Sequence, residues 1–399
     1  MRLSAFTVLI PILSYLDGAT AWGAVGHEVV ATIAQMYLHP TVLPKLCEIL
    51  DFAPGECHIA SVATWADQHR MQMRWSASLH YVGALDDYPS KTCAFPGSRG
   101  WAGSRQINVL DGIRNTSSLL QGWVNHDVND NVAEEALKFL IHFVGDMHQP
   151  LHLTGRDRGG NSVKVRFGRR VTNLHSLWDG FLIAKAVREV PRNYSRPLPY
   201  PKVERALRGT IYDSYIRRLL WEGLLNPWAT EAESWLGCPT PSTTDGSLSS
   251  SGLLGMMHNA YYYTGKLVQS IIKDGVEIIP DSDTICPYAW SKPIHKLNCD
   301  LIWPKEIDEP PYNTVSFDDS FGHDHSHGDH EVFMEDESKS PLLNLDTPEY
   351  AGRVYREMII EKLLAQGGIR LAGLLNYLFA DYDDDTFGPR RPFITTLNV

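Results

Sequence analysis

Hydrophobic residues recur at helical spacing in three long segments of the chain. Between residues 26 and 50 the apolar positions follow the period of an α-helix, and Pro40 marks a break in the pattern. A second such segment covers 132–144 and is followed by Pro150. A third covers 350–379 and predicts a final helix. The three segments predict helices that bury one face in a common core.

Strand-like alternation is rare and short. The clearest example is Val163, Val165 and Phe167, which alternate after the turn at 159–161. We therefore predict a mainly α fold with a few short strands.

Two segments differ in composition from the rest and predict surface insertions or disordered loops. Residues 239–252 are rich in Ser, Thr, Gly and Pro, and residues 305–348 combine Pro, acidic residues and the His-rich tract 323–330. We predict one domain over 22–380 that carries both insertions, followed by a tail at 381–399 with an acidic start.

Composition excludes disorder as the state of the whole chain and limits the partners. Of the 399 residues, 43% are hydrophobic, which is enough for a buried core. Lys and Arg total 36 against 47 Asp and Glu, a formal net charge of −11, which excludes a generic basic groove for nucleic acid. The 16 His direct attention to metal binding, since imidazole is the commonest metal ligand.

The N-terminus predicts export from the cell. Arg2 precedes an apolar stretch at 3–16, and the small residues at 19–21 form a cleavage site, so residues 1–21 are predicted to be a signal peptide. The apolar stretch is shorter than the roughly 20 residues of a membrane span. The mature protein is predicted to begin at Trp22, to be secreted and to have no membrane span.

The oxidising secretory route suits the cysteines and two glycosylation sequons. Six Cys could form three disulfides, and no C-x-x-C pair indicates a thiolate zinc site. Asn115 and Asn193 each begin an N-x-S sequon and are candidate glycan sites.

Histidine and aspartate recur at spacings that suit a metal site. His142 and Asp146 are four residues apart, as are His175 and Asp179, so on a helix each pair shares one face. His152 follows Pro150, which turns the chain in a new direction. A lone buried His is most often a hydrogen-bonded core residue. These two pairs, with the further candidates His27, Asp67 and His80, instead form a nitrogen and oxygen ligand set that suits Zn²⁺.

Six motifs follow one another along the chain: Trp22-Gly23-x-x-Gly26-His27, Trp65-Ala66-Asp67, Leu79-His80-Tyr81, His142-x-x-x-Asp146-x-x-x-Pro150-Leu151-His152, Asp157-x-Gly159-Gly160-Asn161 and Asn173-Leu174-His175-x-x-Trp178-Asp179. With these motifs the chain resembles a known family, the secreted trizinc single-strand-specific nucleases of fungi and plants (S1/P1 type), which are related to bacterial zinc phospholipase C.

The resemblance implies a helical domain of the phospholipase C/nuclease type that holds three Zn²⁺. The implied ligands of the first ion are Asp67, His80, His142 and Asp146. Those of the second are His152, His175 and Asp179. Those of the third are His27, a bridging Asp146, and the free amino group and carbonyl oxygen of Trp22. An uncleaved precursor is therefore expected to be inactive.

The resemblance also implies the reaction and its substrates. These are single-stranded DNA and RNA, cleaved to 5′-phosphate products, and 3′-nucleotides. Asp67 would orient the nucleophile, and Arg70, where the family often has Lys, would neutralise transition-state charge. Tyr81 would stack on an unpaired base, and Asn161 would contact substrate. Gly83 stands where the best-known fungal members carry an Asp that touches the base.

A disulfide and two alternative functions complete the expectations. Cys93 matches a family disulfide position, with Cys299 as its candidate partner. Tyr81 could instead be a core residue, Arg70 a surface ion-pair partner and Asn161 a turn-stabilising residue. A phospholipase C that acts on phosphocholine lipids would share the ligands, and a secreted zinc-binding protein without turnover remains a second alternative.

Overall fold

Helices build most of the molecule. The computed structural model describes residues 22–53, 55–104, 107–239, 281–314, 342–381 and 391–397. In chain order the α-helices are α1 (Ala24–Met36), α2 (Val42–Ile49), α3 (Trp65–Gln68), α4 (Val109–Val124), α5 (Asp130–Met147), α6 (Leu174–Ser176), α7 (Leu182–Arg188), α8 (Pro201–Ala206), α9 (Asp213–Leu219), α11 (Pro287–Leu297), α12 (Ala351–Arg356) and α13 (Ile359–Phe379). The predicted mainly α fold is confirmed.

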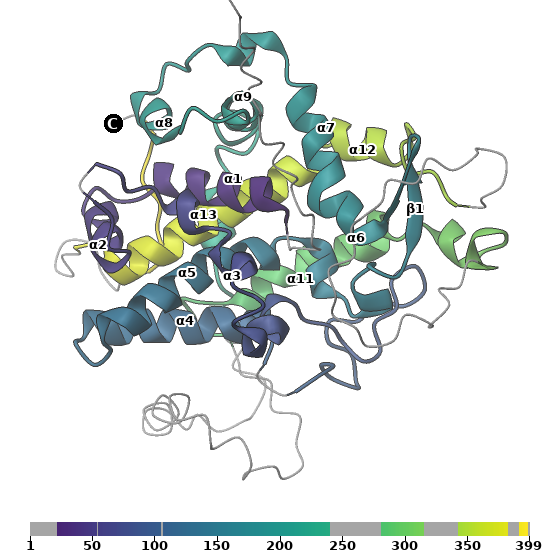
Figure 1. Cartoon of the computed structure of the whole chain (residues 1–399), viewed down its shortest axis with the longest axis horizontal. Coiled ribbons are helices and arrows are strands. Elements are labelled where there is room, and N and C mark those ends of the chain that lie inside the picture. The colour runs from purple at the N-terminus through teal and green to yellow at the C-terminus, as the bar shows by residue number, and fades with distance from the viewer. Residues whose placement is uncertain are drawn as a thin grey trace, which may run out of the picture.

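Helices α1, α4, α5 and α13 pack against one another and form the core that supports the site. Figure 1 shows α1 lying across α13, with α4 beside α5. Gly368 lies where α13 passes α1, and a Cβ atom there would come within 2.5 Å of Ile33 Cγ2 and 3.1 Å of the Val30 carbonyl oxygen. The absence of a side chain at this position lets the N-terminal and C-terminal helices approach closely.

Local sequence explains where several helices begin and end. The 26–50 segment forms α1 before Pro40, as its pattern predicts, and a second helix, α2, after it. Helix α5 begins after Asn129, whose side chain accepts a hydrogen bond from the Val132 amide. Helix α4 was not predicted, because its sequence contains Gly, Asn, Ser and Thr. The Asn108 side chain caps its first turn, and packing against α5 buries its apolar face.

The predicted final helix over 350–379 is wrong in one respect, because the structure divides it into α12 and α13. Met358 separates the two helices with a left-handed backbone, φ 49° and ψ 42°. The apolar period continues through this residue, so the pattern alone did not reveal the change of direction.

One small hairpin interrupts the helical architecture. Strand β1 (Lys164–Phe167) pairs antiparallel with β2 (Arg170–Asn173), with Lys164 opposite Asn173. The alternation predicted β1, but β2 was missed because its side chains are only partly buried. The hairpin leads directly into α6, which carries His175.

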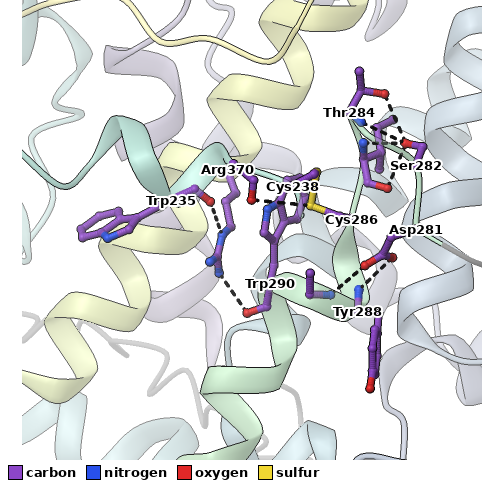
Figure 2. Close-up of a disulfide and its surroundings, with 12 residues drawn as sticks. Trp235, Cys238, Asp281, Ser282, Thr284, Cys286, Tyr288, Trp290 and Arg370 are labelled. Atoms are coloured by element: carbon purple, nitrogen blue, oxygen red, sulfur yellow. Dashed lines mark hydrogen bonds between the residues drawn. A yellow bond between two sulfur atoms is a disulfide. The ribbon is translucent and has the colours of Figure 1, made fainter. Parts of the chain in front are cut away.

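Three disulfides join the described segments: Cys47–Cys57, Cys93–Cys299 and Cys238–Cys286. The structure thus contains the Cys93–Cys299 bond that the resemblance implied. Figure 2 shows Cys238–Cys286 beside Trp290, with Arg370 reaching between the backbones of Trp235 and Trp290.

Of the two predicted insertions, 239–252 and 305–348, the structure describes only the ends. Lys305–Asp308 forms a 3₁₀ turn, and Asn344 bridges to Arg166 of β1, so both ends of the 305–348 segment lie on the domain. The signal peptide, the His-rich tract and nearly all of 239–252 lie outside the described residues. Within the described ranges, no helix has the length and apolar character needed to cross a membrane.

Candidate metal centre

Helix α5 provides the central pair of the candidate site. His142 and Asp146 lie one turn apart, as their spacing predicts, and His142 Nε2 is 3.3 Å from Asp146 Oδ2. Both side chains are fully buried. A carboxylate and an imidazole are therefore placed side by side in the core, where water cannot solvate them.

Three further predicted ligands come from segments that pack on α5. Asp146 Oδ2 lies 2.9 Å from His80 Nδ1, and Asp146 Oδ1 lies 3.4 Å from His27 Nε2. Asp67 Oδ1 lies 3.6 Å from His142 Nε2. Asp146 thus stands at the centre of the cluster, with histidines at both oxygens.

Helix α1 approaches α5 closely at this point. A Cβ atom on Gly145 would lie 2.5 Å from His27 Nδ1, so only glycine leaves room for that imidazole. The rings of His27 and His142 stack with their centres 4.0 Å apart.

The second predicted group gathers beside the first. His152 lies in the 3₁₀ turn Pro150–Leu153, which follows the end of α5. His175 Nε2 is 3.1 Å from Asp179 Oδ2 across α6 and a π-helical turn, and the ligand atoms of His152, His175 and Asp179 lie within 4.8 Å of one another. His152 Nδ1 is 3.8 Å from Asp146 Oδ1, which joins the two groups.

Backbone carbonyls orient three of the imidazoles. The Nδ1 atom of His142 donates to the Ala63 carbonyl at 2.8 Å, that of His152 to the His80 carbonyl at 2.7 Å, and that of His175 to the Gly159 carbonyl at 2.7 Å. Each bond fixes the ring and leaves Nε2 as the atom with a free lone pair, the arrangement typical of metal-binding histidines.

Several buried polar atoms of the cluster have no hydrogen-bond partner. They are both ring nitrogens of His27, Nε2 of His142 and of His152, Oδ1 of Asp146 and Oδ2 of Asp179. Unpartnered buried polar atoms are rare and costly, so this many in one place indicate a missing partner. All are imidazole nitrogen or carboxylate oxygen atoms, the atom types that bind metal ions, and the residues present fit a divalent cation of the zinc type.

Burial controls the electrostatics of the cluster. It raises the pKa of Asp146 well above its usual range, and it lowers the pKa values of His27 and His152 well below theirs. The physical cause is that a charge in the protein interior loses its hydration. Cations held at the cluster would replace that lost hydration for the carboxylates and would use the neutral imidazoles as donors.

Trp22, the first residue of the predicted mature chain, lies at the start of the segment that leads into α1. Its side chain is fully buried, and the amide of the next residue, Gly23, donates to the Asp179 carbonyl at 2.9 Å. A Cβ atom on Gly26 would lie 2.7 Å from Trp22 Cβ. The first residue of the predicted mature chain therefore packs against Gly26, which precedes the candidate ligand His27, and the next residue is bonded to the candidate ligand Asp179.

The predicted substrate residues lie around the cluster in different settings. Burial lowers the pKa of His80. The negative charge of Asp67 raises this pKa, and the positive charge of Arg70 lowers it further, so both side chains lie near His80. Tyr81 is 52% exposed, which argues against the alternative of a core residue. Asn161 donates to the Arg158 carbonyl at 2.9 Å, the turn-stabilising contact of the alternative reading.

Sequence reasoning missed residues that support the ligands. Gln149 is fully buried, and its Nε2 donates to Asp179 Oδ1 at 2.5 Å, which leaves Oδ2 as the free oxygen. Asn298 holds the turn that carries His152 through a 2.6 Å bond to the Pro150 carbonyl. Gln149 could have been found from the sequence, because it lies between the predicted ligands Asp146 and His152. Asn298 could not, because it lies 148 residues from Pro150, the residue that it bonds.

Gly83 meets the chain at a point where a side chain has no room. A Cβ atom on Gly83 would lie 2.6 Å from Gly155 N and 2.8 Å from Gly155 Cα. These are backbone atoms, which cannot rotate away. The backbone of this chain therefore leaves no space at residue 83 for the Asp side chain that the best-known fungal members carry there.

Comparisons with known proteins agree with the geometry. The S1/P1 Nuclease family matches residues 22–245, which include all the predicted ligands of the cluster. Endonuclease 4 of Arabidopsis thaliana is 34% identical over 265 residues, 60% of this chain and 84% of that protein. Nuclease P1 of Penicillium citrinum is 37% identical over 175 residues, 42% of this chain and 60% of that protein, and nuclease S1 of Aspergillus oryzae is 33% identical over 181 residues, 45% and 58%. With its motifs, its helical fold and its buried cluster of histidines and aspartates, the chain belongs to the S1/P1 nuclease family.

Proposed function

We propose that this protein is a secreted, zinc-dependent endonuclease that cleaves single-stranded DNA and RNA to 5′-phosphate products and also dephosphorylates 3′-nucleotides. Membership of the family makes it a nuclease, a hydrolase of phosphodiester bonds. The single observation that carries the metal dependence is the set of buried ligand atoms without hydrogen-bond partners. The three disulfides support secretion.

We assign the ligands of three Zn²⁺ to the clustered residues. Asp67, His80, His142 and Asp146 would hold one ion, and His152, His175 and Asp179 would hold a second. His27, Asp146 and the terminal amino group and carbonyl oxygen of Trp22 would hold a third. The short distances from Asp146 to His80, His142 and His27 support its place in two of these sets. When bound, zinc supplies Lewis-acid stabilisation of phosphate charge and lowers the pKa of water toward about 7.

The chain's own residues orient the reaction. The Asp67 side chain is 12% exposed whereas that of Asp146 is fully buried, so Asp67 lies at the open side of the cluster. Its carboxylate accepts a hydrogen bond from the attacking water and directs that oxygen at phosphorus. Arg70, one turn further along, neutralises charge that develops on the phosphate oxygens.

The product ends follow from which bond breaks. The water oxygen forms a bond to phosphorus, the bond from phosphorus to the 3′-oxygen breaks, and that 3′-oxygen leaves with a proton. The phosphate therefore stays on the 5′ side. In a 3′-nucleotide the same step releases inorganic phosphate.

Tyr81 accounts for the preference for single strands. Its backbone is extended and is held on both sides, because the Val82 amide donates to the His152 carbonyl at 2.8 Å and the Val109 amide donates to the Tyr81 carbonyl at 3.1 Å. An exposed ring fixed beside His80 offers a face for an unpaired base. Bases in a duplex have no free face to offer.

A substrate assay with metal analysis tests the proposal. Purified secreted protein is incubated with single-stranded DNA, RNA, double-stranded DNA and 3′-AMP, with and without chelator, and product ends are mapped. We expect chelator-sensitive cleavage of the single strands with 5′-phosphate ends, and about three zinc ions per molecule. Phosphocholine release from lipids would favour the phospholipase alternative. Zinc binding without any hydrolysis would favour the non-catalytic one. The family and its relatives favour neither alternative.

A further inference from the structure

Exposed hydrophobic side chains gather on the segment that joins two predicted ligands. Between Asp67 and the residue after His80, Met71 is 43%, Trp75 56% and Tyr81 52% exposed. Large apolar side chains grouped at the surface mark binding sites more often than chance. Tyr81 has a role in the proposed function, but Trp75 has none.

The Trp75 ring is held in place although more than half of the residue is exposed. It packs edge-on against Phe139 of α5, with ring centres 5.6 Å apart. Phe139 stacks on Phe143 at 5.0 Å, and Phe143 meets the ring of His80 at 5.3 Å. A continuous row of aromatic rings thus connects Trp75 to a predicted metal ligand. A fixed ring loses little conformational entropy when a planar ligand stacks on it.

The surroundings of Trp75 suit an anion. Arg74, the preceding residue, is exposed, and no ion pair or side-chain hydrogen bond is recorded for it among the described residues. Lys138 lies 5.0 Å from the centre of the neighbouring Trp65 ring, and its charge is paired with Glu134. Although the chain has a net charge of −11, Arg74 places an exposed positive charge directly beside Trp75 in the sequence.

We propose that Trp75 and Arg74 form a second stacking subsite for single-stranded nucleic acid. The Trp75 ring would stack on one base of a single strand while Tyr81 stacks on another base of the same strand. Arg74 would pair with a phosphate of the backbone between those two bases. The inference rests on the proposed function and extends it, because it makes binding depend on strand length. Short substrates reach only Tyr81, whereas longer single strands reach both rings.

Binding and turnover of long and short substrates test this subsite. The holoenzyme and the Trp75→Ala variant are compared by fluorescence anisotropy with a hydrolysis-resistant phosphorothioate octathymidylate, and by steady-state turnover of 3′-AMP. Trp75→Ala is expected to raise the Kd for the octamer about tenfold, which is typical of one lost base stack. The kcat and KM for 3′-AMP are expected to stay within about twofold. Trp75→Phe should recover most of the octamer affinity.

Two further variants separate stacking, charge and general surface effects. Trp221 is 41% exposed and lies in the π-helical turn Leu220–Leu224, so Trp221→Ala is the matched control and should leave both readouts unchanged. Arg74→Ala should reduce the slope of log Kd against log salt by about one.

Each result has one interpretation. Equal octamer affinity for Trp75→Ala and Trp221→Ala would overturn the subsite, and so would a parallel loss of 3′-AMP turnover, which indicates a structural effect. If the unmodified holoenzyme neither binds nor cleaves single strands, the proposed function itself fails, and the subsite fails with it.

Discussion

Two buried polar clusters meet the C-terminal end of α5 and differ in how their atoms are satisfied. In the ligand cluster around Asp146, several nitrogen and oxygen atoms have no hydrogen-bond partner. Two residues further on, His148 is equally buried, but its Nδ1 donates to the Val144 carbonyl at 2.7 Å and its Nε2 accepts from Arg370 at 2.8 Å. Burial of a histidine alone therefore does not distinguish a candidate ligand from a structural residue, whereas several unpartnered nitrogen and oxygen atoms gathered at one place indicate a candidate metal centre.

The second cluster is a structural one. The Arg370 guanidinium also donates to the Trp235 carbonyl at 3.0 Å and the Trp290 carbonyl at 3.4 Å, and it lies over the Trp290 ring. Burial lowers the pKa of Arg370 to about 9, so it remains charged at neutral pH. It connects α13 to the end of α5, and nothing in its hydrogen bonding calls for an ion.

Loss of Asp146 would test the ligand cluster most severely. We expect Asp146→Ala to lower kcat/KM on single-stranded DNA by about 1000-fold or more, because one carboxylate is removed from two ions. Zinc content, measured by elemental analysis, should fall by at least one ion. The control is Asp213→Asn, which changes a buried acid that accepts hydrogen bonds from the Gly209 amide and the Thr210 hydroxyl. Full activity of the Asp146 variant would refute the site.

Retention of the leader tests the role of Trp22 in the same cluster. A variant in which the predicted cleavage site at 19–21 is blocked should lose about 100-fold in activity, because an acylated nitrogen is a poor metal donor. Zinc should fall toward two ions per molecule, as measured in purified precursor and processed protein side by side. Equal zinc content and equal activity in the two forms would remove the terminal amino group from the ligand set.

Arg370→Met probes the satisfied cluster. It leaves His148 Nε2 and the Trp235 carbonyl without their donor, so the free energy of unfolding should fall by about 2–4 kcal/mol in urea titrations. Zinc content and kcat/KM of the folded protein should remain within about twofold. Arg353→Met, which removes an exposed pair with Glu357, is the control and should cost less than about 1 kcal/mol. Loss of zinc in Arg370→Met would show that the two clusters are not separate.

The close contact at Gly83 makes a smaller prediction. Gly83→Ala should reduce the free energy of unfolding by about 1–3 kcal/mol, because the new Cβ meets backbone atoms of Gly155. Gly180→Ala, where a Cβ meets nothing within 4 Å, is the matched control. If both variants unfold at the same denaturant concentration as the original protein, the backbone at residue 83 has room for a side chain.

The smallest expected effect concerns Asp308 and pH. Burial raises the pKa of this carboxyl, but the bond from Ser90 and the charge of Arg156 outweigh it, and the net pKa is lowered. A lowered pKa gives stability that is present above the unfolded value, near 4, and is lost as the pH falls through the folded value. Asp308→Asn should therefore cost about 1 kcal/mol at pH 7 and progressively less below pH 4. A pH-independent difference between the two proteins in urea titrations would contradict this.

The local parts of the fold and site were predictable from sequence because they depend on spacing along one element. The i, i+4 period placed His142 beside Asp146 on α5, and the apolar pattern predicted α1 and β1. The motifs identified the family, and with it the disulfide between Cys93 and Cys299. Trp75 carried no such signal, since exposure of a tryptophan is not written in a local pattern.

From the sequence alone we could predict the types of the candidate ligands, the helices that carry His27, His142 and Asp146, and the class of reaction. Tertiary structure alone decided which atoms stay unpaired. Gln149 takes one oxygen of Asp179, Arg370 takes the free nitrogen of His148 from 222 residues away, and Gly155 fills the space beside Gly83. The physical reason is that a helical period fixes neighbours within one turn, whereas hydrogen-bond satisfaction and close packing depend on segments brought together only by the folded core.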